Sequence, residues 1–161
     1  MIPETPSYYR VPAPLGALAA RLPTFPPSLA LAVALNLALG RLLPRESLEP
    51  LAGRRVRLKV SDAGVACQVR YDGRRFWPES AAGTVDLLIS ATAHDFALLA
   101  ARREDADTLF FARRLVMEGD TDLGLIVKNT LDAVDWPRLT PADLLPHRAL
   151  PLILRFAAKR A

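Results

Sequence analysis

The chain has 161 residues, of which 51% are hydrophobic, and a formal net charge of +4 at pH 7. This length and apolar content suit one domain with a sizeable core and exclude a disordered polypeptide. The single cysteine, Cys67, excludes an internal disulfide and is typical of the reducing cytosol. The longest apolar run, Leu29–Leu39, is interrupted by Asn36 and is shorter than the roughly 20 residues that span a bilayer. We therefore expect neither a secretory signal nor a membrane-spanning helix.

The charge is distributed unevenly along the chain. Residues 41–75 carry nine Lys/Arg and four Asp/Glu, residues 76–137 carry five and eleven, and residues 138–161 carry five and one. A basic front and a basic tail therefore flank an acidic middle. Basic segments bind either nucleic acid or anionic lipid, and the apolar residues beside the charges should decide between the two.

Seven of the 14 prolines lie in residues 1–27, which predicts an extended N-terminal arm ahead of a body formed by residues 28–161. At the start of the body, Ser28 is placed as the N-cap of a helix, and Gly40 is placed at its end. This helix is apolar on nearly all sides, so we expect it to be buried on more than one face. It is either a central core helix or a helix with one face in a ligand cavity.

Alternating or short apolar runs predict five strands. The first two are joined by a turn at Asp62-Ala63-Gly64, and the second ends at the hairpin sequence Asp72-Gly73. The expected strands are Arg54–Val60, Val65–Tyr71, Arg74–Pro78, Val85–Ser90 and Arg113–Met117.

Helices are predicted between and after these strands. Thr92 and Asp95 favour the start of a helix at His94–Arg102, and Asp120 is a cap for a helix over 121–134. The expected helices also include a short turn at Asp105–Phe111 and a helix starting at Thr140-Pro141. Together the elements predict an α+β fold, in which a five-stranded sheet is covered on one side by helices.

The sequence offers little for catalysis or metal binding. The two histidines, His94 and His147, stand far apart and have no metal-ligand spacing with each other or with Cys67. No glycine-rich phosphate loop and no GxSxG motif is present. We therefore predict no catalytic residue, no metal and no cofactor. The remaining enzyme hypothesis uses His94, or Glu118 with Asp120, as acid–base groups on a lipid.

Arginines bracket Phe110-Phe111, a pattern that also occurs in single-stranded nucleic-acid binding. The acids Glu104, Asp105 and Asp107 lie in the same window and would repel phosphates. We therefore predict that the chain does not bind nucleic acid, and that these are solvated arginines around two core phenylalanines.

The C-terminal tail combines apolar and basic residues in the manner of an interfacial helix on anionic lipid. The alternative is a last core helix with a fraying basic end, and both descriptions can hold at once. The predicted membrane-contact residues are Arg148, Leu152, Ile153, Arg155, Phe156, Lys159 and Arg160.

The segment Gly119-Asp120-Thr121-Asp122-Leu123-Gly124-Leu125, after a short strand and before a helix, resembles the glycine–aspartate signature of sterol-carrier-protein-type lipid-binding domains. The upstream strand Leu87–Ala91 and the helix from His94 match the same layout. The longer motif from Arg102 to Thr121 is similar to an accessory lipid-binding family of ubiquinone biosynthesis. The similarity is strong over residues 85–135, extends by layout from Pro27 to Arg160, and does not include the N-terminal arm.

The resemblance implies a sheet and helices that enclose a hydrophobic cavity. It implies a non-catalytic role in the oxygen-independent branch of ubiquinone synthesis in a proteobacterium, with the chain holding isoprenoid quinone intermediates or phospholipid. Separate iron–sulfur hydroxylase proteins would be partners, together with other ubiquinone-biosynthesis proteins, since one cysteine cannot hold a four-cysteine cluster. The expected location is the cytoplasm, at the surface of the inner membrane.

Periodicity selects the apolar residues expected to line the cavity: Leu31, Leu35, Phe96, Leu99, Phe110, Phe111, Val116, Leu123 and Ile126. Burying each CH₂ group stabilises by roughly 0.8 kcal/mol, so a long prenyl tail binds there without a polar anchor. The alternative function is a ligand-free interaction module that recruits quinone-modifying enzymes to the membrane.

Overall fold

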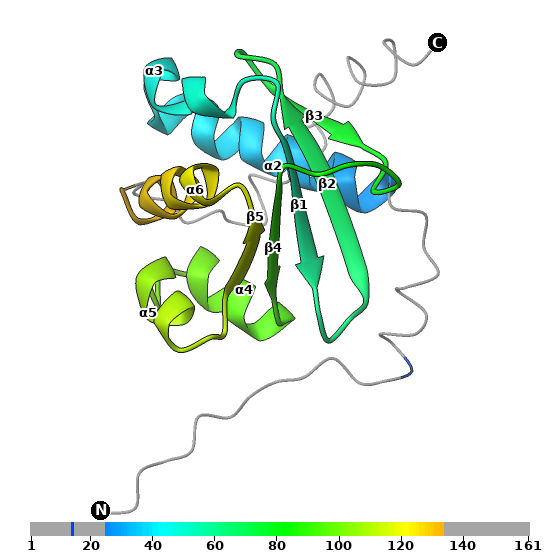
Figure 1. Cartoon of the computed structure of the whole chain (residues 1–161), viewed down its shortest axis with the longest axis vertical. Helices are drawn as coiled ribbons and strands as arrows, with labels where there is room; N and C mark the ends of the chain where they lie inside the picture. The colour runs from blue at the N-terminus through cyan, green and yellow to red at the C-terminus, as the bar shows by residue number, and fades with distance from the viewer. Residues whose placement is uncertain (1–13, 15–24, 134–161) are drawn as a thin grey trace, which may run out of the picture.

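The computed structural model describes residue 14 and residues 25–133 (Figure 1). Its helices are α2 (Phe25–Leu42), α3 (Arg45–Leu48), η1, a 3₁₀-helix (Glu49–Leu51), α4 (Ala93–Ala100), α5 (Ala106–Phe111) and α6 (Thr121–Ala133). Its strands are β1 (Arg55–Val60), β2 (Val65–Tyr71), β3 (Phe76–Glu79), β4 (Leu87–Ala91) and β5 (Val116–Gly119). None of the helices in this part of the chain is long and apolar enough to cross a membrane.

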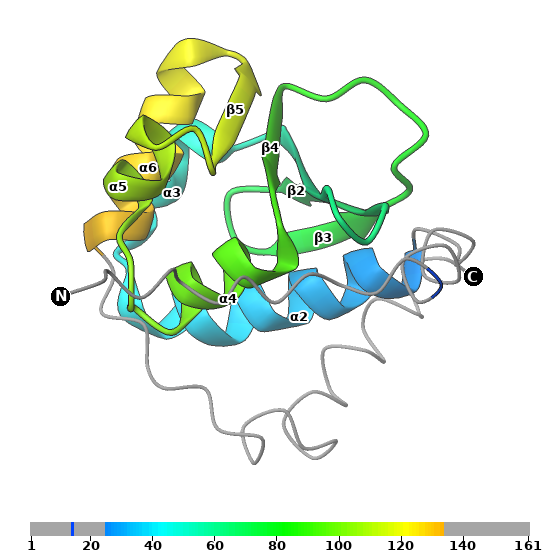
Figure 2. The same cartoon turned by 90° about the horizontal axis from the view of Figure 1, so that it is seen from below.

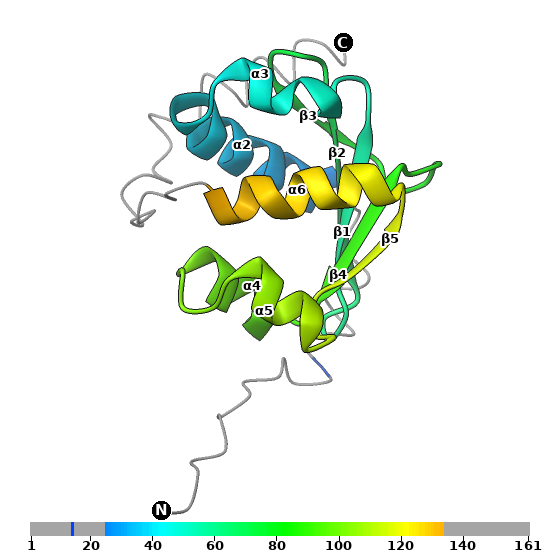
Figure 3. The same ribbon diagram turned by 60° about the vertical axis from the view of Figure 1, so that its left-hand side comes forward.

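The five strands form one sheet in the order β3-β2-β1-β4-β5. β1 and β4 are parallel, and the other neighbours are antiparallel. Figures 2 and 3 show α2, α4, α5 and α6 on the same side of this sheet. The predicted α+β fold, a five-stranded sheet with helices on one side, is confirmed.

Helix α2 is longer than predicted at both ends. It begins at Phe25, so Pro26 and Pro27 lie in its first turn, where the N–H that proline lacks has no intrahelical partner in any helix. The expected N-cap at Ser28 is therefore wrong. Ser28 is fully buried, and its hydroxyl oxygen accepts a hydrogen bond of 2.9 Å from the backbone N–H of Gln68 in β2. The expected end at Gly40 is also wrong, since the helix continues to Leu42.

Asn36, the polar interruption in α2, fixes this helix to the edge strand β3. Its side-chain amide donates to the carbonyl of Phe76 at 2.8 Å, and its side-chain oxygen accepts from the N–H of Phe76 at 2.9 Å. The amide thus takes the place of a neighbouring strand for one residue of β3. The helix packs across β2 and β3 at this position, with Ala32 and Val33 buried in the core.

The core lies between the sheet and its helices. Alternation along the strands directs one set of side chains towards the helices, and these are nearly inaccessible to solvent. This set includes Val56, Val69, Tyr71, Phe76, Leu87, Ile89 and Ala91. From the helical layer, Leu48, Leu51, Ala106, Leu109 and Leu123 complete the core. The short segment α3–η1, which sequence periodicity did not predict, contributes Leu48 and Leu51.

On the opposite face of the sheet the described residues place no helix, and polar side chains of β1, β2 and β3 form a network there. Glu79 on β3 accepts from Arg55 at 3.0 Å, from Arg70 at 2.8 Å and from the Gln68 amide at 3.3 Å. Arg57 donates to the Gln68 side-chain oxygen at 2.8 Å. Gln68, at the centre of this network, is 1% exposed and has its side-chain oxygen and amide both hydrogen-bonded.

Replacing Glu79 with glutamine is expected to remove part of the acid sensitivity of folding. Partial burial alone would raise the pKa of Glu79, but the hydrogen bonds from Arg70 and Gln68 and the charge of Arg55 outweigh it and lower the pKa below 4.5. A carboxyl with a lowered folded pKa stabilises the protein above its unfolded pKa, and this contribution disappears as the pH falls through the folded pKa. Urea midpoints of wild type and Glu79→Gln should therefore differ at about pH 6 and converge towards about pH 3. Parallel midpoints throughout would contradict the assignment.

Several predicted features lie outside the described residues. These are the arm over 1–13 and 15–24, the helix expected at Thr140-Pro141, and all seven predicted membrane-contact residues from Arg148 to Arg160. The arm–body boundary at residue 27 and the membrane contact stay predictions.

Candidate ligand pocket

The glycine–aspartate sequence lies at the point where β5 ends and α6 begins. Gly119 pairs with Leu87 across the β4–β5 ladder and has φ of +121°. A Cβ atom on residue 119 would lie 2.3 Å from the carbonyl oxygen of Asp86. Only glycine permits this approach, which allows the N–H of Asp120 to donate to the same Asp86 oxygen at 3.0 Å.

Asp120 caps α6, as the sequence predicted. Its Oδ1 accepts from the N–H of Leu123 at 3.0 Å, and a second carboxylate, Asp86, accepts from the backbone N–H of Arg55 at 2.7 Å. The Arg54 guanidinium lies 3.3 Å from Asp86 and 3.8 Å from Asp120. These contacts fix the first turn of α6 against β4 and β1, so the helix starts at a defined place above the sheet.

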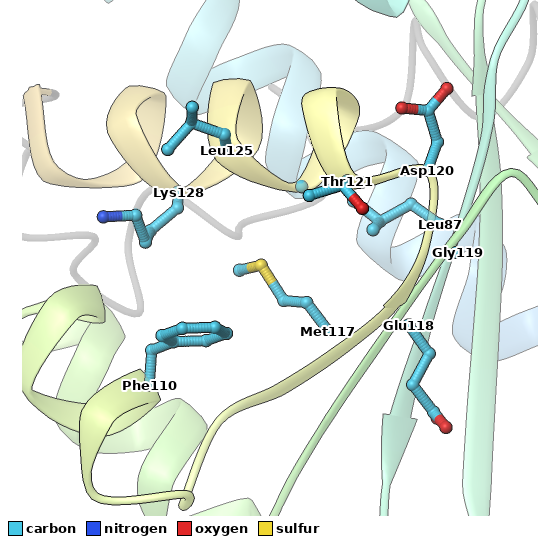
Figure 4. Close-up of a pocket in the computed structure, with 10 residues that line it drawn as sticks. Leu87, Phe110, Met117, Glu118, Gly119, Asp120, Thr121, Leu125 and Lys128 are labelled. Atoms are coloured by element: carbon cyan, nitrogen blue, oxygen red, sulfur yellow. The ribbon is translucent and has the colours of Figure 1, made fainter.

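A pocket of about 230 Å³ lies between α5, α6 and β5. Figure 4 shows Phe110 from α5, Met117 from β5, and Leu125 and Lys128 from α6 around the same space. Glu118 points away from it, because neighbouring residues of a strand face opposite sides. The lining residues are Leu87, Phe110, Met117, Glu118, Gly119, Asp120, Thr121, Gly124, Leu125 and Lys128.

Gly124 opens the pocket from within α6. It is buried in the second turn of the helix, and a Cβ atom there would lie 3.5 Å from Leu87 and 3.8 Å from the sulfur of Met117. These are ordinary contact distances, so the backbone does not require glycine here. The missing side chain leaves space between α6 and the sheet instead.

Polar contacts join α5 and the loop before it to α6, beside the pocket. Lys128 on α6 forms an ion pair with Asp107 on α5. Asp132 accepts from the N–H of Ala106 at 2.9 Å, and Arg102 donates to the carbonyl oxygen of Leu131 at 3.2 Å. The two helices are thereby held side by side, as Figure 3 shows.

The loop from α5 into β5 is anchored by ion pairs of the partly buried Arg114, one of them to the buried Asp95. Arg114 donates through Nε to Asp95 at 2.9 Å and through Nη1 to Glu104 at 2.7 Å. Asp95 also accepts from the hydroxyl of Thr92, the N-cap of α4. Burial alone would lower the pKa of Arg114, but the hydrogen bonds and charges of Glu104 and Asp95 outweigh it and raise the pKa. The guanidinium therefore stays charged and joins α4 to the strand that lines the pocket.

The structure places the nine predicted lining residues in different surroundings. Phe110 lines the pocket. Phe111 is 79% exposed and is not among the lining residues. Val116, 42% exposed, is not among them either, because it pairs with Ser90 on the sheet face opposite the described helices. Leu123 is a core residue, and Ile126 is half-buried. The remaining four pack partly buried against the core: Leu31, Leu35, Phe96 and Leu99.

Sequence periodicity missed Met117, Gly124 and Lys128 as lining residues. Met117 lay in a predicted strand, but the neighbouring Val116 was chosen. The sequence did contain a signal for Gly124. A glycine inside a helix destabilises the helix by about 1 kcal/mol relative to alanine, which indicates that the position has a packing role. No sequence signal marks Lys128, because its burial depends on α5.

Glu118 and Asp120 belong to residues that line the pocket, but the candidate acid–base groups are not paired inside it. Asp120 is held as a helix cap, Glu118 points to the opposite side, and His94 is half-buried in the first turn of α4. Burial raises the pKa of the Cys67 thiol, which disfavours the reactive thiolate at neutral pH. Within residues 25–133 no group of three or more His, Cys, Asp or Glu side chains is placed to hold a metal ion.

Comparison with known proteins gives a family and a fold. A profile of the SCP-2 sterol transfer family matches residues 35–132. The ubiquinone biosynthesis accessory factors UbiT of Escherichia coli strains K12 and O157:H7 are each 54% identical over 57 residues, which is 35% of this chain and 33% of each relative. The match thus spans about a third of the length of these relatives.

Among solved structures, a UbiJ-SCP2 ubiquinone synthesis protein matches with a TM-score of 0.55 and 21% identity, over 67% of this chain and 96% of that chain. This likeness shows a shared fold. The match to the family profile runs from α2 through the pocket to the end of α6 and covers more than half of the chain. This protein therefore belongs to the SCP-2 sterol transfer family.

Proposed function

We propose that this protein is a non-catalytic lipid-binding accessory factor of ubiquinone biosynthesis. The observation that carries the proposal is the apolar pocket between α5, α6 and β5 in a chain of the SCP-2 sterol transfer family. The segment that is 54% identical to the UbiT accessory factors of E. coli supports the pathway.

The lining of the pocket suits an apolar chain. Phe110, Met117, Leu87 and Leu125 give it an apolar lining, and each CH₂ that leaves water for such a lining contributes roughly 0.8 kcal/mol. Its volume of about 230 Å³ lies below the roughly 300–1,000 Å³ of pockets that enclose a whole drug-sized ligand. The pocket therefore takes part of a long isoprenoid or acyl chain, and the contact area along that chain determines the affinity.

The carboxylates near the pocket are also consistent with lipid binding. Of the two carboxylates near the pocket, Asp120 is used as a cap and Glu118 faces away. General acid–base chemistry needs a group within hydrogen-bonding reach of the reacting atoms. The residues that line the pocket thus favour binding over catalysis.

We further propose a ligand, a pathway branch, a cellular location and partner proteins. The ligand is a prenylated quinone intermediate or a phospholipid, and the pathway branch is the oxygen-independent one. The basic tail from Arg148 to Arg160 contacts the inner membrane reversibly from the cytoplasm. Iron–sulfur hydroxylase proteins and other proteins of ubiquinone synthesis receive or supply the ligand.

Solvent extraction of the purified protein followed by mass spectrometry tests the proposal. Wild type should yield a prenylated phenol, quinone or phospholipid at near-stoichiometric amounts. Gly124→Leu should lose most of this lipid, because the added side chain projects towards Leu87 and Met117 and fills the pocket. Gly124→Ala is the matched control, since its Cβ makes ordinary contacts and should leave occupancy unchanged while stabilising α6 by about 0.5–1 kcal/mol.

Thermal melts of both variants separate loss of lipid from loss of fold. A folded wild type without any extractable lipid would overturn the lipid-binding function. That result would favour the ligand-free recruitment module, to which the exposed Phe111 and Leu125 would then belong. Equal lipid content in Gly124→Leu and wild type would instead move the ligand to another part of the molecule.

A further inference from the structure

Among the ten described residues that line the pocket, Lys128 is the single cation. Its side chain is only 16% exposed, although a lysine is almost never buried without a partner. An ammonium group has three hydrogen-bond donors. Asp107 accepts one of them, and within the described part of the chain Lys128 has no other polar partner. Two donors therefore remain for another acceptor.

The ion pair stands at the border between two hollows of different character. Lys128 lines the apolar pocket, whereas Asp107 lines a neighbouring polar hollow of about 650 Å³ together with Arg102 and Arg103. A molecule with an apolar tail in the first hollow would therefore present its polar end to Lys128. This arrangement matches an amphipathic ligand better than a wholly apolar one.

We propose that Lys128 is the head-group anchor of the pocket and that it binds the carboxylate of an acid-headed, apolar-tailed molecule in place of Asp107. The proposal rests on the proposed lipid-binding function and names the chemical class of its ligand. Burial of the apolar tail gives affinity but does not distinguish one head group from another. Lys128 would provide that selectivity.

The exposures of the two partners support the exchange. Asp107 is 49% exposed and returns to water at little cost, whereas the 16% exposed Lys128 does not. An incoming carboxylate restores the charge balance that the departing one removes. Lys128 is therefore the fixed group and Asp107 is the group that is displaced.

The other acids of the polar hollow are already engaged. Asp105 caps α5 by accepting from Thr108 at 2.6 Å, and Glu104 pairs with Arg114. Asp132 accepts from the backbone N–H of Ala106 at 2.9 Å. Their charges are offset by neighbouring guanidinium groups or helix-terminal N–H groups, so they do not prevent a carboxylate from reaching Lys128.

The test compares ligands that differ only in the head group. One pair is hexadecanoic acid and hexadecanol, and the other is a geranylated hydroxybenzoic acid and the matching geranylated phenol. Displacement of a fluorescent apolar probe from the full chain gives the four affinities. Wild type should prefer each acid by about tenfold, as expected for one charge-assisted hydrogen bond in a partly buried site. A preference in the alkyl pair alone or in the aromatic pair alone identifies the source of the carboxylate.

Two variants test the roles of Lys128 and Asp107, and they are expected to change the affinity for the acids in opposite directions. Lys128→Met should bring each acid down to the affinity of its neutral counterpart. Asp107→Asn should raise the affinity for the acids a few-fold, because the competing carboxylate is gone. A purely structural ion pair predicts that both variants weaken all four ligands equally, and that result would overturn the assignment.

The outcomes separate this inference from the proposed function. If wild type binds acids and neutral ligands equally, and neither variant changes the ratio, Lys128 is not a head-group anchor but the pocket remains a lipid site. If none of the four ligands binds, both proposals are overturned. Should Lys128→Met fail to fold, the affinity of Asp107→Asn for the acids still decides the assignment.

Discussion

Arg114→Leu is expected to lower the free energy of unfolding by about 3–5 kcal/mol, because it leaves a buried carboxylate without its cation. The Asp95 side chain is only 4% exposed, and Arg114 donates to it at 2.9 Å. After the substitution, the Thr92 hydroxyl is a neutral partner that cannot compensate the charge. Urea denaturation at neutral pH measures the loss as a lower midpoint with an unchanged slope.

Two further variants separate the contribution of the Arg114–Asp95 pair from that of Glu104. Glu104→Gln changes the second partner of Arg114, which is 30% exposed, so its effect should stay below about 1 kcal/mol. The double variant Asp95→Asn with Arg114→Leu removes the buried carboxylate charge together with its partly buried cation and should recover much of the loss. If the double variant is less stable than Arg114→Leu alone, the guanidinium acts through packing of its stem, and the charge assignment is wrong.

Strands β1 and β2 and the starts of α4, α5 and α6 were predictable because their signals are local. Alternation predicted β1 and β2 to within one residue, and the Asp72-Gly73 turn follows β2 as expected. Thr92, Asp105 and Asp120 each cap the helix that follows through a side chain that accepts a nearby N–H. Such contacts span three residues, so the sequence contains all the information that they need.

The features that sequence reasoning missed depend on contacts between distant segments. Ser28 looked like a cap, but its hydrogen bond goes to Gln68, 40 positions away. Asn36 looked like an interruption, but its partner is the backbone of Phe76. The start of β5 shifted from Arg113 to Val116, since Arg113 has φ of +58° and Leu115 donates back to Leu109 at the end of α5.

The pocket shows the same limit. The α5 residue Phe110 was predicted as a lining residue, whereas the choice of Val116 in place of Met117 put the wrong face of β5 towards the cavity. A shift of one position exchanges the two faces of a strand. Gly124 lines the pocket through the absence of a side chain, which periodicity of apolar residues does not detect.

Gly119→Ala is expected to destabilise the protein by at least about 3 kcal/mol, because it combines backbone strain with a clash. Its φ of +121° lies where residues with a Cβ are rarely found, and the new Cβ would lie 2.3 Å from the Asp86 oxygen. Backbone atoms on both sides would have to move. The hydrogen bond from Asp120 to Asp86 and the start of α6 depend on the same contact.

Gly73→Ala provides a matched control for this prediction. Gly73 has φ of +91°, but a Cβ there meets no atom within 4 Å, so its substitution reports the conformational cost alone, about 1–2 kcal/mol. The difference between the two variants in urea denaturation measures the clash at the β4–β5 junction. Because Leu87, Gly119 and Gly124 all line the pocket, Gly119→Ala should also lower the lipid content that the proposed function predicts, whereas Gly73→Ala should leave it unchanged. Equal losses of stability would mean that β5 can move away from Asp86 without cost. In that case Asp120, and not Gly119, would be the structurally required residue of the glycine–aspartate sequence.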